Sequence, residues 1–111
     1  AKLYYMVDSK RDLDAFVPLL GDIVMPVDGV ERHLVGWEEW AITTRIDGAA
    51  YWRTVLRAAL CHQSQMQSFP DLKSWSDEQH QLLWSQRSYY RAFSLANGGR
   101  ELEHDLFEGL R

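Results

Sequence analysis

The chain has 111 residues, of which 46% are hydrophobic and 25% charged, a composition typical of a folded globular protein rather than of a disordered linker. Its net charge of -4, with acids and bases interspersed, offers no basic stripe for a phosphate backbone, so we expect no nucleic-acid partner. Its single cysteine cannot form an internal disulfide, and no apolar run approaches the roughly 20 residues that span a bilayer. We therefore expect one cytoplasmic, soluble unit over residues 1–111, without membrane contact.

The first elements predicted are a strand and a helix. Residues 2–7 are rich in aromatic and branched side chains, a pattern typical of a short buried strand. Ser9 and Asp12 have the spacing of a capping box, and the apolar side chains behind them recur at helical spacing. Pro18 lacks a backbone donor and disfavours helical geometry in the residue before it, so we expect this helix to end or kink at residues 16–17.

Residues 21–40 are the most loop-like part of the sequence. Glycines and a proline interrupt the apolar runs there, so at most a short strand is expected over residues 23–27. The second half mixes aromatic with charged side chains, among them His33 and Trp37, and such a mixture suits a loop that covers a binding cleft. The alternative is a surface connection whose tryptophans pack into the core.

A strand and the central helix follow. Branched side chains predict a strand over residues 41–46, and Asp47 is a natural cap for the next helix. We expect that helix to run without interruption into residues 62–65 and to end at Phe69 and Pro70. Its apolar stripe, at spacings i, i+3, i+4, i+7 and i+8, consists of Trp52, Val55, Leu56, Ala59 and Leu60. Extending the same wheel places Gln63 on this stripe and His62 at its edge, where leucines would be expected.

The last third of the chain contains a helix and an ambiguous segment. Ser76 and Gln79 form a second capping-box pattern, which predicts a helix over residues 77–87. Residues 88–96 either extend this helix or form a third strand, and their aromatic content together with the Asn-Gly-Gly turn favours the strand. Residues 101–111 are acidic with an apolar stripe, and we expect a short docked helical end. The chain as a whole is therefore predicted to be α/β.

Few residues carry an obvious chemical pattern. The four histidines lie in separate segments without the spacings of zinc ligands: His33, His62, His80 and His104. Residues 103–105 are of ligand type but contiguous, so they are expected to form a solvated acidic face. Cys61 and His62 would point about 100° apart on a helix, so they are not a nucleophile with its base. By pattern alone, His62 is more often a capping residue than a catalytic one.

The segment that contains His62 resembles a motif of a known protein family. Residues 46–47 are an aliphatic-Asp pair, and residues 59–65 read Ala-Leu-Cys-His-Gln-Ser-Gln. This arrangement resembles the late signature of the PIG-L/LmbE-like deacetylases, in which an aliphatic-Asp pair precedes a helix ending in Ala-x-x-His-x-Ser-Gln. Residues 2–5 resemble the strand after the catalytic half of that family, and residues 103–110 its acidic ending. The cysteine form is most similar to members that deacetylate glycopeptide-antibiotic (teicoplanin-type) intermediates.

The resemblance implies that residues 1–111 form the C-terminal part of a Rossmann-like α/β fold. It also implies zinc-dependent hydrolysis of an N-acyl group on a glucosamine-type sugar of a glycopeptide. Members of the family carry a His-Pro-Asp-Asp-Glu segment and a His-x-x-His segment, which supply the Zn²⁺ ligands and an aspartate base. Neither segment occurs in this sequence. We therefore expect both in an N-terminal half of the same enzyme, before Ala1, as the main partner of this chain.

By the family pattern, His62 is the catalytic residue of this chain. It would donate a proton to the leaving amine or stabilise the oxyanion, in its own active site or in that of a neighbouring subunit of a homo-oligomer. Gln63 and Gln65 would orient His62 or bind the sugar, and the loop with His33 and Trp37 would contact a bulky substrate. The alternative is an independent α+β interaction module, without catalytic activity, that binds a protein through its tryptophan-rich surface.

Overall fold

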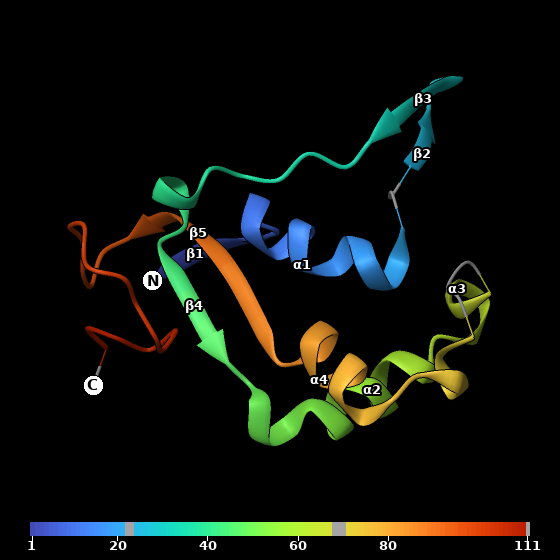
Figure 1. Cartoon of the computed structure of the whole chain (residues 1–111). Helices are drawn as coiled ribbons and strands as arrows, with labels where there is room; N and C mark the ends of the chain where they lie inside the picture. Colours follow the sequence, from blue (N-terminus) through green and yellow to red (C-terminus); the bar gives the residue numbers. More distant parts are fainter. Residues whose placement is uncertain (22–23, 68–70, 111) are drawn as a thin grey trace.

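The chain is described by a computed structural model over residues 1–21, 24–67 and 71–110. It is a mixed α/β structure with a small antiparallel sheet, a separate hairpin and several helices (Figure 1). In chain order the elements are β1 (Lys2–Val7), α1 (Lys10–Leu20), β2 (Val24–Val27), β3 (Val30–His33), η1 (Glu39–Ala41), β4 (Thr44–Asp47), η2 (Ala49–Tyr51), α2 (Trp52–Leu60), α3 (Gln63–Met66), η3 (Leu72–Ser74), α4 (Asp77–Trp84) and β5 (Gln86–Ser94), where η denotes a 3-10 helix.

The main sheet has three strands in the order β1-β5-β4, and both outer strands run antiparallel to β5. The mixed α/β class is thereby confirmed. A small antiparallel sheet does not show the Rossmann-like fold that the resemblance implies, because that fold is built on a mostly parallel sheet. The strand predicted for residues 2–7 is confirmed as β1, and β5 confirms the strand alternative for residues 88–96.

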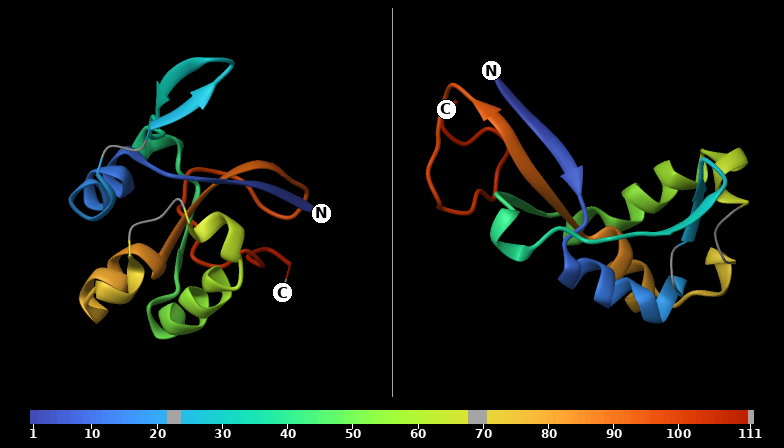
Figure 2. Two further views of the ribbon diagram at one scale, coloured as in Figure 1. Left: turned by 90° about the vertical axis from the view of Figure 1, so that its right-hand side faces the viewer. Right: turned by 90° about the horizontal axis from the view of Figure 1, so that it is seen from above.

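One face of the main sheet is left open. Leu3 of β1 pairs with Phe93 of β5, and each is 51% exposed. On the other face Tyr4 meets Tyr89 edge to face, with ring centroids 6.0 Å apart, and the C-terminal tail lies beside them at the end of the sheet where both termini are found (Figure 2). The C-terminal tail therefore covers the Tyr4 side of the sheet, whereas the opposite side is left exposed at Leu3 and Phe93.

The first helix starts as expected and ends later. The Ser9 hydroxyl accepts the Asp12 N–H at 3.1 Å, and the Asp12 carboxylate accepts the Ser9 N–H at 3.2 Å, which confirms the capping box. The expected end at residues 16–17 is wrong, because α1 continues through Pro18 to Leu20. A proline in the last turn removes only one backbone donor, and the N–H of Gly21 still closes that turn on the Val17 carbonyl at 2.8 Å.

Two boundaries in the middle of the chain also differ from the prediction. The strand expected over residues 41–46 begins only at Thr44, because the residues before it form η1. Asp47 accepts the Ala49 N–H at 2.9 Å and so closes the turn that becomes η2, whereas α2 itself begins at Trp52 without a side-chain cap. The short strand expected over residues 23–27 is present as β2 from Val24 onward, while Ile23 lies outside the described residues.

The single central helix expected up to residue 65 is wrong. α2 ends at Leu60, and His62 has φ −87° and ψ 63°, outside the helical region. A separate short helix, α3, then covers Gln63–Met66. The expected end at Phe69 and Pro70 lies outside the described residues. Since the helical wheel does not continue past Cys61, the predicted place of Gln63 on the apolar stripe is also wrong.

The core lies where α2, η3 and α4 meet. α4 begins at the predicted capping box, in which the Ser76 hydroxyl accepts the Gln79 N–H at 3.2 Å, and it stops at Trp84 instead of residue 87 because β5 starts at Gln86. Four buried apolar side chains form the main cluster: Trp52, Leu72, Leu83 and Trp84. α2 and α4 lie side by side on the same side of the molecule (Figure 1).

The molecule is open in shape for its length. Its radius of gyration is 15.7 Å, whereas a compact domain of this length has about 13 Å. Large apolar side chains are correspondingly exposed, among them Trp40 at 85% and Val35 at 77%. The core formed by α2 and α4 therefore covers only part of the apolar surface that the chain carries.

Candidate functional site

His62 lies at the break between α2 and α3, at the outer end of the helical part of the molecule (Figure 1). Its main chain is fixed, because its N–H donates to the Ala59 carbonyl at 3.0 Å and its carbonyl accepts the N–H groups of Gln65 and Met66 at 3.0 and 3.1 Å. Its side chain is exposed and makes no capping hydrogen bond. Within the part of the chain that the structure describes, the imidazole has no hydrogen-bond or ion-pair partner.

The neighbours of His62 share this exposure. We call residues 60–66 the helix tip. Gln63 and Gln65 are both exposed in α3, one and three residues after His62. The thiol of Cys61 donates to the Arg57 carbonyl at 3.3 Å, which ties it back to the preceding turn of α2 rather than to the imidazole. The helix tip therefore presents one imidazole with two amide side chains on the same short segment.

Trp37 lies in a different place, against the main sheet. Its ring meets that of Tyr90 with centroids 5.2 Å apart. The main-chain N–H of Trp37 donates to the Asp8 carbonyl at 2.9 Å, and the main-chain carbonyl of Trp37 accepts the Lys10 N–H at 2.9 Å. Gly36 allows this close approach, because a Cβ there would stand 2.6 Å from the Lys10 nitrogen. The segment before η1 is thus held against the start of α1.

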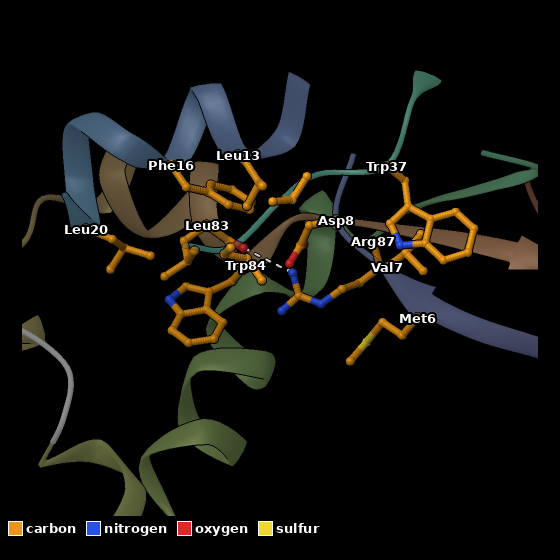
Figure 3. Close-up of a pocket in the computed structure, with 12 residues that line it drawn as sticks. Met6, Val7, Asp8, Leu13, Phe16, Leu20, Trp37, Leu83, Trp84 and Arg87 are labelled. Atoms are coloured by element: carbon orange, nitrogen blue, oxygen red, sulfur yellow. Dashed lines mark hydrogen bonds between the residues drawn. The ribbon is translucent and has the colours of Figure 1, made fainter. Parts of the chain in front are cut away.

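Trp37 lines a pocket of about 430 Å³ between the end of β1, α1 and α4 (Figure 3). Most of its lining is apolar, including Leu13 and Phe16 of α1 and Leu83 of α4. Its charged groups are Asp8 and Arg87, and Figure 3 shows the Asp8 carboxylate pointing toward the Arg87 guanidinium. This volume and this mixture of lining are typical of sites for small molecules.

The charges of this pocket are perturbed. Burial raises the pKa of Asp8, the nearby Asp12 carboxylate raises the pKa further, and Arg87 opposes both effects. One guanidinium nitrogen of Arg87 donates to the carbonyls of Leu83 and Gln86, at 3.1 and 3.0 Å, which fixes the side chain at the junction of α4 and β5. Asp8 is therefore a carboxyl group that takes up a proton more readily than a solvated aspartate.

The structure does not bring the five predicted site residues together. His62, Gln63 and Gln65 share the helix tip, while His33 ends β3 in the separate hairpin and Trp37 lies against β5 (Figure 1). Of these five residues, only Trp37 lines the pocket next to α1. His33 and Trp37 were expected to contact the substrate from one loop, but His33 does not line the pocket that Trp37 lines.

The fit to Zn²⁺ can be judged from the donors present. Among residues 1–21, 24–67 and 71–110, no group of three or more histidine, cysteine, aspartate or glutamate side chains is placed to hold a metal ion. A catalytic zinc site needs about three protein ligands. The described residues therefore do not fit Zn²⁺, and no step of chemistry is assigned to a metal held by them.

A buried carboxylate was missed by the sequence reasoning. Glu103 is 1% exposed, so the expected solvated acidic face is wrong at this position. It accepts hydrogen bonds from five side chains on four segments; we call this set the Glu103 cluster: Lys2 at 2.6 Å, Tyr4 at 2.9 Å, Thr44 at 3.1 Å, Asn97 at 3.1 Å, and Arg91. The tail is also tied to β4, where the N–H of Glu103 donates to the Thr43 carbonyl at 2.9 Å. Residues 101–110 form turns rather than the expected helical end.

The Glu103 cluster suits a structural role. Burial alone would raise the pKa of Glu103, but hydrogen bonds from Lys2, Asn97, Arg91 and Tyr4 outweigh it and lower the pKa to about 2. The carboxylate is thus ionised at neutral pH and its oxygens are fully occupied. No local pattern could have revealed this, because the partners come from β1, β4, β5 and the loop after β5.

No described helix has the length and apolar character that a membrane crossing requires. Comparison of the chain with protein-family models, with curated proteins and with solved structures finds no significant match. The geometry of the helix tip, of the pockets and of the Glu103 cluster is therefore what the structure offers for a functional assignment.

Proposed function

We propose that this chain is the C-terminal part of a zinc-dependent hydrolase that removes an N-acyl group from a glucosamine-type sugar, with a glycopeptide-antibiotic precursor as the acceptor. The sequence basis is the likeness of residues 46–47 and 59–65 to the PIG-L/LmbE-like signature. The observation that carries the proposal is the exposed imidazole of His62, which stands on a fixed main chain and has no partner among the described residues. A histidine whose ring makes no internal contact is free to meet a substrate.

The incomplete packing of the molecule supports a larger protein. The radius of gyration of 15.7 Å exceeds the roughly 13 Å of a compact domain, and the sheet face that carries Leu3 and Phe93 is half exposed. Further polypeptide packed on this face would bury apolar area that the chain itself leaves in water. In the proposal, that polypeptide is the N-terminal half, which extends the sheet into a Rossmann-like fold and supplies the Zn²⁺ ligands.

The role proposed for this chain is confined to its own residues. His62 donates a proton to the sugar amine as it leaves, or hydrogen-bonds the oxygen that becomes negative during attack. Gln63 and Gln65 offer amide donors and acceptors for the hydroxyl groups of the sugar. His62 immediately precedes the short helix α3, which contains Gln63 and Gln65, so all three side chains lie on one short exposed segment.

The proposal is tested with His62→Ala in the complete, zinc-loaded protein that contains this chain. We expect kcat for release of the free amine from an N-acyl-glucosaminyl substrate to fall by about 10²- to 10⁴-fold, the usual range for loss of an acid–base group. Zinc content, measured by plasma mass spectrometry, should stay at the wild-type value because His62 is not proposed as a ligand.

His104→Ala is the matched control, since His104 is also an exposed histidine but lies in the C-terminal tail. Its kcat should equal that of the wild type. Full activity of the His62→Ala variant would contradict the role of His62, and hydrolysis without any bound zinc would contradict the reaction class.

A second candidate is an independent interaction module, favoured by the exposure of Trp40 at 85% and Val35 at 77%, which lie close together in sequence before β4. Exposed tryptophan is enriched in protein-binding surfaces. Residues 1–111 expressed alone distinguish the two candidates. A cooperative unfolding transition of a monomer favours the module, whereas an unstable chain that becomes soluble only with its N-terminal half favours the hydrolase.

A further inference from the structure

A second pocket, of about 440 Å³, opens between α2 and the segment formed by η3 and α4. It contains none of the five residues predicted from the sequence as site residues. Its floor is aromatic and its rim is basic, and these two properties come from different elements of the fold. The inference drawn from it is independent of the hydrolase proposal.

The floor is built from stacked rings. Trp52 and His80 stack with centroids 6.0 Å apart and planes at 11°, and the ring of Trp75 is tilted by 40° against that of His80 with centroids 5.6 Å apart. Trp52 is 4% exposed and His80 is 7% exposed, so neither ring can turn away from its neighbours. Trp75 is the partly exposed ring of the three, and a ring held in place in this way favours a flat, aromatic ligand at little cost in conformational entropy.

His80 also contributes a polar group to the pocket. Its Nδ1 accepts the indole N–H of Trp84 at 3.3 Å, so the proton of the neutral ring is on Nε2. Nε2 has no hydrogen-bond partner among the described residues. Every fully buried side-chain nitrogen or oxygen in that part of the chain does have a partner, so Nε2 is not sealed in the core. Since His80 lines this pocket, Nε2 is a donor available there.

The rim carries excess positive charge. Arg53 is already engaged, since it pairs with Asp77 at 3.2 Å and its guanidinium lies 4.3 Å from the centre of the Trp52 ring. Arg57 and Lys73 line the same pocket, and within the described residues neither side chain has a hydrogen-bond or ion-pair partner. Among the described residues of the lining, Asp77 is the single carboxylate, so this lining is positive in a chain whose net charge is -4. A local field of this sign attracts anions.

We propose that this pocket binds a small aromatic carboxylate. The aromatic body lies against Trp75, the partly exposed ring that Trp52 and His80 support, and the carboxylate is held by Arg57 and Lys73. The planar fork of a guanidinium matches the two oxygens of a carboxylate, and hydrogen bonds between charged groups are about twice as strong as neutral ones. The Nε2–H of His80 donates to the same anion from the floor.

The test uses the full chain with 2-naphthoate as the probe and 2-naphthamide as its uncharged counterpart. We expect 2-naphthoate to bind at least about tenfold more tightly by titration calorimetry, because only the anion can pair with the rim. In ¹H–¹⁵N spectra, the indole signals of Trp52 and Trp75 should shift and that of Trp40 should not. Equal affinity for the two probes, no binding at millimolar concentration, or a shift confined to Trp40 would each overturn the proposal.

Two double variants with the same change in net charge distinguish the contribution of the rim residues to binding from the effect of the net charge of the protein. Arg57→Gln/Lys73→Gln should weaken 2-naphthoate binding by about tenfold while leaving 2-naphthamide unchanged. The control is Arg32→Gln/Arg100→Gln, which makes the same change in net charge at exposed positions on β3 and after β5. If both double variants weakened binding equally, the net charge of the protein and not the rim of this pocket would explain the effect, and the proposal would be overturned. Because all four side chains are exposed, both variants are expected to fold.

Discussion

The Glu103 cluster and the helix tip treat polar side chains in opposite ways. Glu103 is 1% exposed and holds five donors, whereas His62 is exposed and its imidazole has no partner among the described residues. In the Glu103 cluster, both carboxylate oxygens are satisfied by hydrogen bonds within the protein. At the helix tip, the imidazole nitrogens remain available to hydrogen-bond a ligand. The comparison indicates that Glu103 of the acidic tail, whose residues are of metal-ligand type, has a structural role, and that the helix tip is the better place to look for chemistry.

Replacing Glu103 should have the largest effect on stability. Glu103→Gln leaves the Lys2 ammonium and the Arg91 guanidinium without their carboxylate, and both of these side chains are almost fully buried. Breaking a buried ion pair by removing one partner costs about 3–5 kcal/mol of the free energy of unfolding. Urea denaturation followed by far-ultraviolet circular dichroism measures the loss.

Glu101→Gln is the control for this variant, because it removes the same charge two residues away at an exposed position. It should change the free energy of unfolding by less than about 0.5 kcal/mol. A similar loss in both variants would mean that the tail acts through its net charge and not through the Glu103 cluster.

Acid should weaken the protein through the same carboxylate. The pKa of Glu103 is lowered from 4.5 to about 2 in the folded state, so its contribution to stability is complete above pH 4.5 and is lost as the pH falls toward 2. Free energies of unfolding measured between pH 6 and pH 2 should fall over this interval in the wild type. The Glu103→Gln variant should fall less steeply over the same interval, and parallel curves would contradict the assignment.

Replacing His62 should have the smallest effect on stability. His62→Ala removes an imidazole that contacts nothing described, so the free energy of unfolding should stay within about 0.5 kcal/mol of the wild type. Thermal unfolding followed by calorimetry provides the value. A loss above about 1 kcal/mol would show that the ring is structural and would remove the contrast with Glu103.

Local signals in the sequence predicted the starts of two helices and the presence of two strands. The capping boxes at Ser9 and Ser76 placed the beginnings of α1 and α4, because each box is completed by a residue three positions along the chain. The composition of residues 2–7 and 88–96 identified the strands β1 and β5 for a similar reason. Such patterns need no knowledge of distant partners.

Features that depend on distant contacts were not predictable. The break between α2 and α3 falls at His62 in a run whose helical pattern continues through it, so periodicity alone gave one helix. The burial of Glu103 depends on Lys2 and Thr44, which are 101 and 59 residues away in sequence. The pocket lined by Trp52, Trp75 and His80 joins two separate helical segments, and only their packing together reveals it.

The pairing of β1 with β5 sets an order for synthesis of the protein. β1 occupies residues Lys2–Val7, yet the strand that pairs with it among the described residues spans Gln86–Ser94, so β1 leaves the ribosome long before this pairing can form. Contacts of such large sequence separation also slow folding, because the intervening loop must close first. During that interval β1, with its apolar side chains Leu3, Tyr5 and Met6, is without its partner strand. This strand is where aggregation of the nascent chain would begin and where a chaperone would bind.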